Sequence, residues 1–396
     1  MSANQYDIVI IGGGTAGITV AARLRKRAKN LSIAIIEPES KHYYQPLWTL
    51  VGAGIVPMSD SEREERDFIP QGVNWIQDSV TSFDPENNSV NLNSSTTIQY
   101  KYLIVCPGIQ IDWNKIEGIE AAIGKDGVCS NYAKDHVEKT WQFIRELKSG
   151  EALFTFPNTP IKCAGAPQKI MYLAEDYWRR HGVREKINIT FMSAGKAIFG
   201  VPKYKNALSE IISARGMNTE FGFNLEKIDT ASKEATFRNV ENGETLTKKY
   251  DFIHVAPPMS APDFIKSSPI AAESGWVDVD KFNMRHVKYK NIFSLGDASS
   301  LPTSKTGAAI RKQAPVLVNH LVADLKGYQS QSKYDGYTSC PLVTSYNKLI
   351  LAEFDYDGNP AETFPFDQAK ERTSMYLLKR YGLPNLYWHG MLRGRA

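Results

Sequence analysis

Apolar runs and a helical pattern alternate along the first forty residues. Residues 6–11 (YDIVII) are apolar after Asp7 and rich in β-branched side chains, which indicates a fully buried parallel strand. The run passes directly into residues 12–17 (GGGTAG), and the following ITVAARLRKRA predicts a helix. A second apolar run, LSIAII, ends at Glu37. This order predicts a strand–helix–strand unit that contains a G-x-G-x-x-G turn.

The glycine turn is typical of a dinucleotide-binding site. Gly12 allows the tight turn, Gly14 lets the backbone approach a pyrophosphate, and Gly17 lets the helix pack closely on the strand. The helix N-terminus supplies the positive end of a dipole, and Glu37 can accept hydrogen bonds from a ribose. The candidate cofactor-binding residues of this unit are Gly12, Gly14, Thr15, Ala16, Gly17 and Glu37.

Two later segments of the chain also carry candidate contacts with the cofactor of the first site. Short strands separated by turns run from about residue 66 to residue 102, where Ser79 and Val80 are candidates to meet an adenine; YLIVCPG then ends in a turn at Gly108. NIFSLGDASSL predicts a strand followed by Gly296 and Asp297, and the aspartate can bind a ribityl hydroxyl. The long helix predicted after it would point its N-terminus at a flavin pyrimidine ring. Together these features favour FAD over NAD at the first site.

Between these two parts the pattern of strands and helices restarts. We therefore expect an α/β fold of two Rossmann-like dinucleotide-binding domains, with a C-terminal membrane-interacting region. The predicted divisions are 1–123 for the first part of the FAD domain, 124–276 for the second Rossmann-like domain, 277–327 for the return to the FAD domain, and 328–396 for the C-terminal quinone and membrane region.

Composition narrows the class of protein. The chain of 396 residues is 42% hydrophobic and 23% charged with a net charge of +4, so it is an ordinary globular chain with no case for a nucleic acid partner. No apolar stretch is long enough to span a membrane, and the glycine turn begins too early to leave room for a signal or transit peptide. The seven histidines are scattered, so no metal site is expected. Four cysteines are too few for a disulfide scaffold, which favours a redox-catalytic pair.

The second domain has lost the corresponding glycine turn. Its strand GEALFTF is followed by residues 157–168 (PNTPIKCAGAPQ), a loop that three prolines stiffen. Without close-approach glycines a pyrophosphate is sterically disfavoured, so we expect no NAD(P)H there. The cysteine pair of disulfide reductases is also missing after Glu37. Another reductant must therefore reach the flavin.

Two cysteines are candidates for that chemistry. Cys163 precedes a predicted helix and has Lys162 and Lys169 nearby; a helix N-terminus and a cation both lower a thiol pKa. Cys340, before Pro341, is expected in a loop. Cys106 lies within an apolar strand and is expected to be a small buried hydrophobe.

Segments around both cysteines, including KCAGAPQKIMYLAEDYW and KYDGYTSCPLVTSYNKLILAEFDY, resemble the sulfide:quinone oxidoreductase family, closest to its mitochondrial branch, over nearly the whole chain. The resemblance implies an enzyme that oxidises hydrogen sulfide through a Cys163–Cys340 disulfide or sulfur-bridged form, passes sulfane sulfur to a small thiophilic acceptor, and sends two electrons through FAD to a quinone. It implies cofactor contacts at Gln45, Val80, Gly108 and Lys305, and quinone contacts at Tyr346, Phe364 and Phe366.

The same resemblance implies peripheral binding at the cytoplasmic face of the inner membrane, or at the matrix face of the inner mitochondrial membrane for a processed eukaryotic chain, and a possible homo-oligomer. The chain departs from the family in ending at MLRGRA, and in having Cys129 near the place of a third bacterial cysteine, where we expect an accessory role at most.

The apolar, aromatic and basic tail fits either a docked helix or an interfacial membrane segment. We expect removal of residues 375–396 to leave sulfide reduction of FAD largely intact. Alternatives are a type II NADH:quinone dehydrogenase, the flavin subunit of a cytochrome-linked sulfide dehydrogenase, and a non-enzymatic FAD-binding module.

Overall fold

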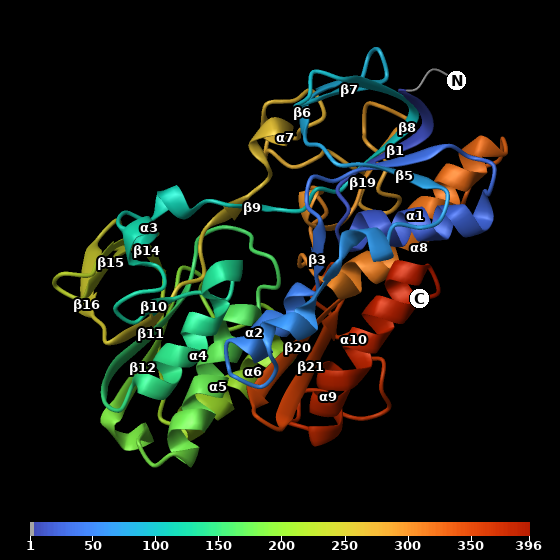
Figure 1. The fold of residues 1–396 in the computed structure, drawn as a ribbon. Coiled ribbons are helices and arrows are strands. Elements are labelled where there is room, and N and C mark those ends of the chain that lie inside the picture. Colours follow the sequence, from blue (N-terminus) through green and yellow to red (C-terminus); the bar gives the residue numbers. More distant parts are fainter. Residues whose placement is uncertain (1–3) are drawn as a thin grey trace.

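The first sheet combines six strands from residues 5–105 with one strand from residues 292–294. Its strands are β1 (Gln5–Ile11), β2 (Ile33–Ile36), β5 (Val73–Ile76), β6 (Val80–Asp84), β7 (Ser89–Leu92), β8 (Thr97–Val105) and β19 (Ile292–Ser294). In the computed structural model, which describes residues 4–396, they take the order β5-β2-β1-β8-β7-β6, and β19 pairs with β8 (Figure 1). The central strands β1, β2 and β8 are parallel, and their apolar stretches at residues 8–11, 33–36 and 103–105 are buried, as in a sheet that is covered on both faces.

Two helices cover one side of this sheet. Helix α1 (Thr15–Arg27) links β1 to β2, and helix α8 (Gly307–Leu325) packs beside it (Figure 1). A Cβ on Gly17 would lie 1.9 Å from the carbonyl oxygen of Gly12. Only glycine therefore allows α1 to begin this close to the end of β1.

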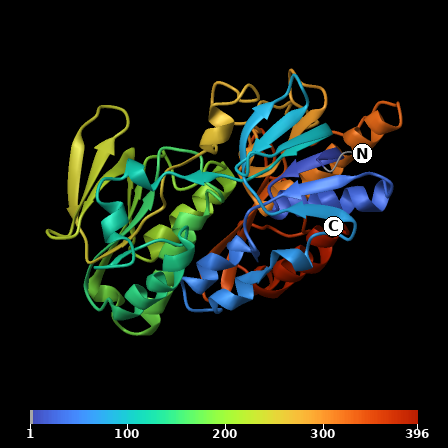
Figure 2. The same cartoon turned by 45° about the horizontal axis from the view of Figure 1, so that its top comes forward.

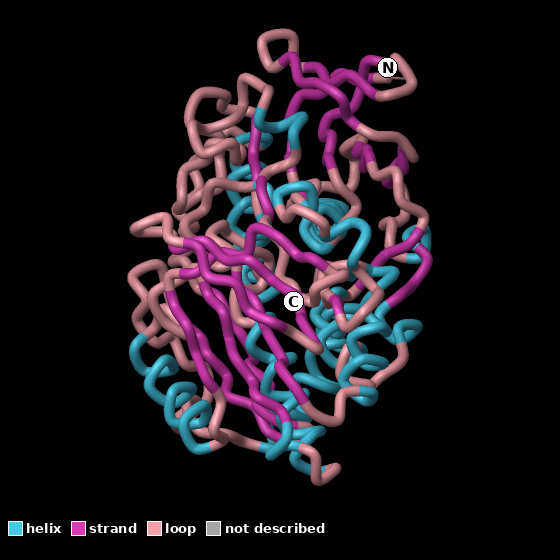
Figure 3. The backbone as a smooth tube through the Cα atoms, turned by 90° about the vertical axis from the view of Figure 1, so that its left-hand side faces the viewer, coloured by secondary structure: helices cyan, strands magenta, loops and turns pink. Residues whose placement is uncertain are grey.

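The second domain repeats the parallel arrangement. Its sheet contains β10 (Val128–Cys129), β11 (Gly150–Phe156), β12 (Ile187–Ser193), β13 (Asn218–Phe221) and β17 (Phe252–His254), in the order β10-β17-β11-β12-β13. Its helices are α4 (Val137–Glu146), α5 (Ala166–Arg180) and α6 (Pro202–Ala214). A separate antiparallel sheet is formed by β14 (Phe223–Asp229), β15 (Glu234–Asn239) and β16 (Thr245–Lys249). Figure 3 shows the strands of the two domains as separate groups.

The chain crosses between the domains twice, and the crossings pair with each other. The antiparallel pair consists of β9 (Gln110–Ile111) and β18 (Met259–Ser260). Other short elements are β3 (Lys41–Tyr43), β4 (Glu62–Glu64), α2 (Trp48–Val51), α3 (Ile119–Ala122) and α7 (Asp263–Lys266).

The C-terminal region lies against both domains. Its hairpin of β20 (Thr338–Ser345) and β21 (Lys348–Phe354) packs on α5. The tail that follows is a continuous helical segment whose type changes along its length: α9 (Thr373–Leu377), a π-helical turn (Leu378–Gly382), α10 (Leu383–Asn385), a second π-helical turn (Leu386–Gly390) and a 3₁₀ turn (Met391–Arg393). The last of these turns packs on α1, as Figure 2 shows from a second angle.

The predicted α/β class with two Rossmann-like domains is confirmed. The four residue divisions given above remain predictions. No helix formed by residues 4–396 is both long enough and apolar enough to cross a bilayer. The tail has features of both a docked helix and an interfacial segment. Some of its large side chains are buried, whereas Leu377, Tyr381 and Leu386 are exposed.

Candidate active site

The first glycine turn is closed on one side and open on the other. Gly12 has a φ of +97°, and a Cβ there would lie 2.5 Å from the carbonyl oxygen of Cys106. Gly14, in contrast, has an ordinary backbone and nothing within 4 Å of an added Cβ. Thr15 and Ala16 follow in the first turn of α1. The space at Gly14 lies at the helix N-terminus, which suits a phosphate group.

Glu37 closes the same turn from the end of β2. One carboxylate oxygen accepts the Gly13 N–H at 2.7 Å, and the other accepts the Glu39 N–H at 2.9 Å. Burial raises the pKa of Glu37 above its usual value, although these two hydrogen bonds oppose the shift. Glu37 therefore lies where a Rossmann domain places its ribose-binding acid. Val80 begins β6, where it is buried and pairs with Leu92, while Gly108 follows β8 with a φ of +88° and open space beside it.

Gly296 and Asp297 follow β19 at the other end of the first site. Gly296 has a φ of +69°, and its N–H donates to Gln313 at 3.0 Å. Burial raises the pKa of Asp297, while the nearby charges of Lys305 and Lys162 oppose the shift. Lys305 Nζ donates to the backbone carbonyl of Asp297 at 2.6 Å, and burial lowers the pKa of this lysine to about 8.

Lysine side chains connect this end of the site to the second domain. Lys162 Nζ donates to Gln45 Oε1 at 2.6 Å, and a β-bridge joins Lys162 to Lys305. Burial lowers the pKa of Lys162 to about 8. The sequence-predicted residues Gln45, Asp297 and Lys305 are thus brought together around one lysine next to Cys163.

Cys163 and Cys340 meet although 177 residues separate them. Their Sγ atoms lie 3.9 Å apart. The Cys163 N–H donates to the carbonyl oxygen of Lys305 at 2.9 Å, and the residue has a φ of +55°, an unfavourable region for a side chain with a Cβ. The expectation that Cys340 lies in a loop is wrong: it is buried in β20, because the Tyr/Ser-rich segment before Pro341 pairs with β21.

Gly165 makes this approach possible. A Cβ at this position would lie 2.3 Å from Cys340 Sγ and 2.6 Å from Leu342 Cδ2. Gly165 is the N-cap of α5, so the positive end of this fifteen-residue helix faces the two sulfur atoms. Gly165, a glycine of the second loop, therefore leaves space for the sulfur atom of Cys340.

Two buried lysines set the charge around the pair. Lys169 Nζ, in the first turn of α5, lies 3.2 Å from Cys163 Sγ. The hydrogen bond from Cys340 and the charges of Lys169 and Lys379 hold the pKa of Cys163 well below its usual range, against the opposing effect of burial. The pKa of Cys340 is raised, first by its hydrogen bond to Cys163 and then by burial. Cys163 is therefore the sulfur better able to exist as a thiolate.

Lys379 comes from the C-terminal tail. It is buried, donates to the carbonyl oxygen of Pro46 at 2.8 Å, and lies 5.8 Å from the ring centroid of Tyr44. Burial lowers its pKa to about 7. The tail therefore does not lie apart from the cysteines, as the expected tolerance of its removal requires, because the charge of Lys379 helps to lower the pKa of Cys163. The sequence analysis did not identify Gly165, Tyr44 or Lys379 as residues of the site. No local sequence pattern links the tail to the second loop.

The other two cysteines lie in buried strands or at their ends. Cys106 follows β8, and Cys129 is in β10. Burial raises the pKa of each thiol well above its usual value. Each therefore has the character of a small buried hydrophobe, as expected for Cys106.

The three residues predicted for quinone lie elsewhere in the C-terminal region. Tyr346 is in the turn of the hairpin, where its hydroxyl donates to the carbonyl oxygen of Ala53 and its N–H to Asp176. Asp176 is ten residues along α5 from its first turn, about 15 Å from the cysteine end. Phe364 and Phe366 stack on each other, with Arg372 over Phe366, in the segment that pairs with β21 on the side away from β20. The structure does not bring these residues to the cysteine pair.

Known proteins resemble this chain along its length. The family model described as pyridine nucleotide-disulphide oxidoreductase matches residues 6–158. A protein of Mus musculus named sulfide:quinone oxidoreductase, mitochondrial, is 50% identical over 392 residues, which cover 99% of this chain and 87% of that protein. A protein of Dictyostelium discoideum with the same name is 51% identical over 395 residues, with the same shares of each chain.

A solved structure supports the fold. The X-ray structure of the sulfide:quinone oxidoreductase from the hyperthermophilic bacterium Aquifex aeolicus superposes with a TM-score of 0.84 at 19% identity, over 99% of this chain and 92% of that chain.

Proposed function

Because this chain belongs to the sulfide:quinone oxidoreductase family, we propose that Cys163 and Cys340 are the pair through which it oxidises sulfide. The family membership makes the chain a flavoprotein oxidoreductase of sulfide and quinone. The observation that carries the assignment of the pair is the 3.9 Å approach of the two Sγ atoms beside Lys169. Cys106 and Cys129 lack a lysine at this distance in the described residues.

The cofactor of the first site is FAD. The open space at Gly14 fits a pyrophosphate at the N-terminus of α1, and Glu37 fits a ribose. Gln45, Val80, Gly108, Asp297 and Lys305 would hold the remaining parts of the same molecule. When bound, FAD would take up the two electrons that re-formation of the disulfide releases, and it would pass them to a quinone.

The first step is attack of hydrosulfide on the Cys163–Cys340 disulfide or sulfur-bridged form. In the disulfide, hydrosulfide bonds to Cys340 Sγ, the bond between the two cysteine sulfurs breaks, and Cys163 leaves as the thiolate. A thiol of low pKa is the better leaving group, and the charges of Lys169 and Lys379 favour that role for Cys163. Negative charge thus moves from hydrosulfide to Cys163, and Cys340 carries a neutral persulfide.

The second step removes the outer sulfur. A small thiophilic nucleophile attacks the terminal sulfur atom of the persulfide, and Cys340 is released as the leaving thiolate. Lys169 interacts with both sulfurs, so its charge also stabilises this second leaving group. Loss of two electrons from the paired thiolates then restores the disulfide.

The tail is the proposed membrane contact. Leu377, Tyr381 and Leu386 are 49%, 55% and 36% exposed, and cationic residues stand between them, which fits an interfacial segment. Binding would be peripheral, at the cytoplasmic or mitochondrial matrix face of the inner membrane. Tyr346, Phe364 and Phe366 stay proposals for contacts with quinone, and a homo-oligomer stays possible on the family resemblance alone.

Substitution of single cysteines tests the proposal. Cys163→Ser and Cys340→Ser should each abolish sulfide-dependent bleaching of the bound flavin, because disulfide exchange needs both sulfur atoms. Cys106→Ser and Cys129→Ser are matched controls that should bleach at a near-normal rate and only reduce stability. Near-normal bleaching in either member of the pair would refute the assignment.

A further inference from the structure

A chain of buried hydrogen bonds joins the C-terminal tail to the first glycine turn. The Tyr387 hydroxyl lies 2.9 Å from Thr15 Oγ1 and 2.5 Å from His42 Nε2. The other ring nitrogen of His42 lies 2.9 Å from Glu65 Oε2. Glu65 is 1% exposed, and His42 and Tyr387 are 3% exposed. The chain thus connects four segments of the molecule, and it is buried except at its partly exposed Thr15 end.

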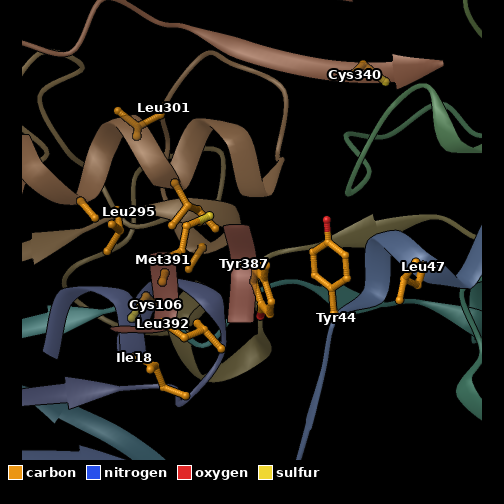
Figure 4. Close-up of a cluster of buried hydrophobic side chains, with 14 of the residues drawn as sticks. Ile18, Tyr44, Leu47, Cys106, Leu295, Leu301, Cys340, Tyr387, Met391 and Leu392 are labelled. Atoms are coloured by element: carbon orange, nitrogen blue, oxygen red, sulfur yellow. The ribbon is translucent and has the colours of Figure 1, made fainter. Parts of the chain in front are cut away.

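Aromatic packing fixes the tyrosine in this position. The ring of Tyr387 lies 4.4 Å from that of Tyr44 by centroids, and Trp388 beside it packs on Phe68 at 4.9 Å. Figure 4 shows Tyr387 and Tyr44 side by side, with Met391 and Leu392 beyond them toward Ile18 of α1. The tail is therefore held at the N-terminus of α1 by packing as well as by hydrogen bonds.

Glu65 has one oxygen atom left for a ligand. Its Oε1 is buried and makes no hydrogen bond within residues 4–396. A Cβ on Gly13 would lie 2.2 Å from this atom and 2.7 Å from the side chain of Glu37. Two carboxylates therefore face the same backbone turn. A buried carboxylate oxygen without a partner is costly, so it marks a place where a donor is expected.

We propose that the tail completes the dinucleotide site through Tyr387, His42 and Glu65. The free oxygen of Glu65 accepts a hydrogen bond from a ribose hydroxyl of FAD, alongside Glu37. His42 transmits the position of Glu65 to Tyr387, and Tyr387 holds the hydroxyl of Thr15 at the helix N-terminus that receives the pyrophosphate. Tyr387 and His42 are positioning residues, and docking of the tail and retention of FAD stabilise each other.

The test is release of FAD from the holoprotein, followed by the rise in flavin fluorescence after dilution. Tyr387→Phe keeps the ring and removes the hydroxyl, and Glu65→Gln removes the carboxylate. Each should raise the equilibrium dissociation constant of FAD by about five- to thirtyfold, the effect of losing one buried hydrogen bond. The matched control is Tyr381→Phe, which removes a hydroxyl from an exposed tyrosine of the same tail and should change nothing.

A double-mutant cycle separates this role from simple loss of folding. Thr15→Val and Tyr387→Phe should be non-additive, because each removes the same hydrogen bond. Additive effects, or a Tyr387→Phe variant that retains FAD as Tyr381→Phe does, would overturn the proposal. The inference rests on the proposed FAD site: a parent protein that holds no FAD would overturn both, whereas normal FAD binding in Tyr387→Phe would overturn this inference alone.

Discussion

The loops after β1 and β11 occupy the same position in their two Rossmann-like domains and have opposite properties. In the first loop, Gly14 leaves open space at the N-terminus of α1. In the second, the chain places Cys163 before the N-terminus of α5, and Gly165 is in van der Waals reach of Cys340. Both loops use a helix N-terminus to favour negative charge. The comparison teaches that one fold can direct this field at a phosphate or at a thiolate, depending on the residues of the turn.

The largest expected effect comes from closing the open side of the first loop. Gly14 has an ordinary φ of −67° and free space beside it, so Gly14→Val should fold without strain while its side chain enters the space proposed for the pyrophosphate. We expect the purified variant to lose nearly all bound FAD, measured as the ratio of flavin to protein absorbance.

A second glycine in the same turn gives the contrast. Gly17→Ala would place a Cβ 1.9 Å from the Gly12 carbonyl oxygen, so it should lower the free energy of unfolding rather than act on FAD alone. If Gly14→Val retains a full complement of FAD, the first loop does not hold the cofactor.

The next effect comes from Gly165 in the second loop. Gly165→Ala should force apart α5 and Cys340, which we expect to cost about 1–3 kcal/mol of unfolding free energy and to slow sulfide-dependent bleaching. Gly200→Ala is a matched control, because an added Cβ there has nothing within 4 Å. Equal stability and equal bleaching in the two variants would show that the close approach is not required.

Lys169→Met should change the pH dependence of Cys163. The pKa of Cys163 lies below its usual value, so its thiolate persists as pH falls and disappears only when pH drops through that lowered pKa. Removing the adjacent charge should raise the apparent pKa of Cys163 toward its usual value. The measurement is the rate of alkylation of the reduced protein by iodoacetamide as a function of pH.

Lys370→Met, at an exposed position, should leave that pH profile unchanged. The contribution of Lys379 should also fade as pH rises through about 7, because burial lowers its pKa to that value and its positive charge is lost above it. An unchanged profile in Lys169→Met would contradict the role given to this lysine.

The smallest effect is expected at the membrane face of the tail. Replacement of Leu377, Tyr381 and Leu386 by glutamine should weaken binding to anionic liposomes by roughly tenfold or more, without loss of FAD. Phe282→Gln, at an exposed apolar residue elsewhere, should not alter flotation. Undiminished flotation of the triple variant would place the membrane contact outside the tail.

Local patterns in the sequence predicted most of the fold. Burial on both faces requires continuous apolar strands, so local composition alone predicts the apolar run of β1 and the strand before Gly296. The glycine turn is likewise a local pattern. The helix that the tail pattern allowed is present, as consecutive α, π and 3₁₀ turns over residues 373–393. Its aromatic residues pack on α1 and on the loop at Tyr44, and no local signal contains that information.

The candidate site was predictable only in its chemistry. The glycines and acid of the first turn, and two cysteines flanked by lysines or proline, identify the groups. That Cys340 lies in a strand, that Gly165 makes room for its sulfur, and that Lys379 reaches the pair all depend on contacts between distant segments. The placement of Tyr346 on α5 likewise follows from how the hairpin docks.

Anaerobic titration of the holoprotein tests the contrast between the two loops most directly. Sulfide should bleach the flavin absorbance stoichiometrically, and a soluble quinone should restore it. NADH at the same concentration should leave the spectrum unchanged, because the second loop places Cys163, and not a glycine turn open to a phosphate, before the N-terminus of α5. Bleaching by NADH, or no response to sulfide in protein whose disulfide is intact, would contradict the account.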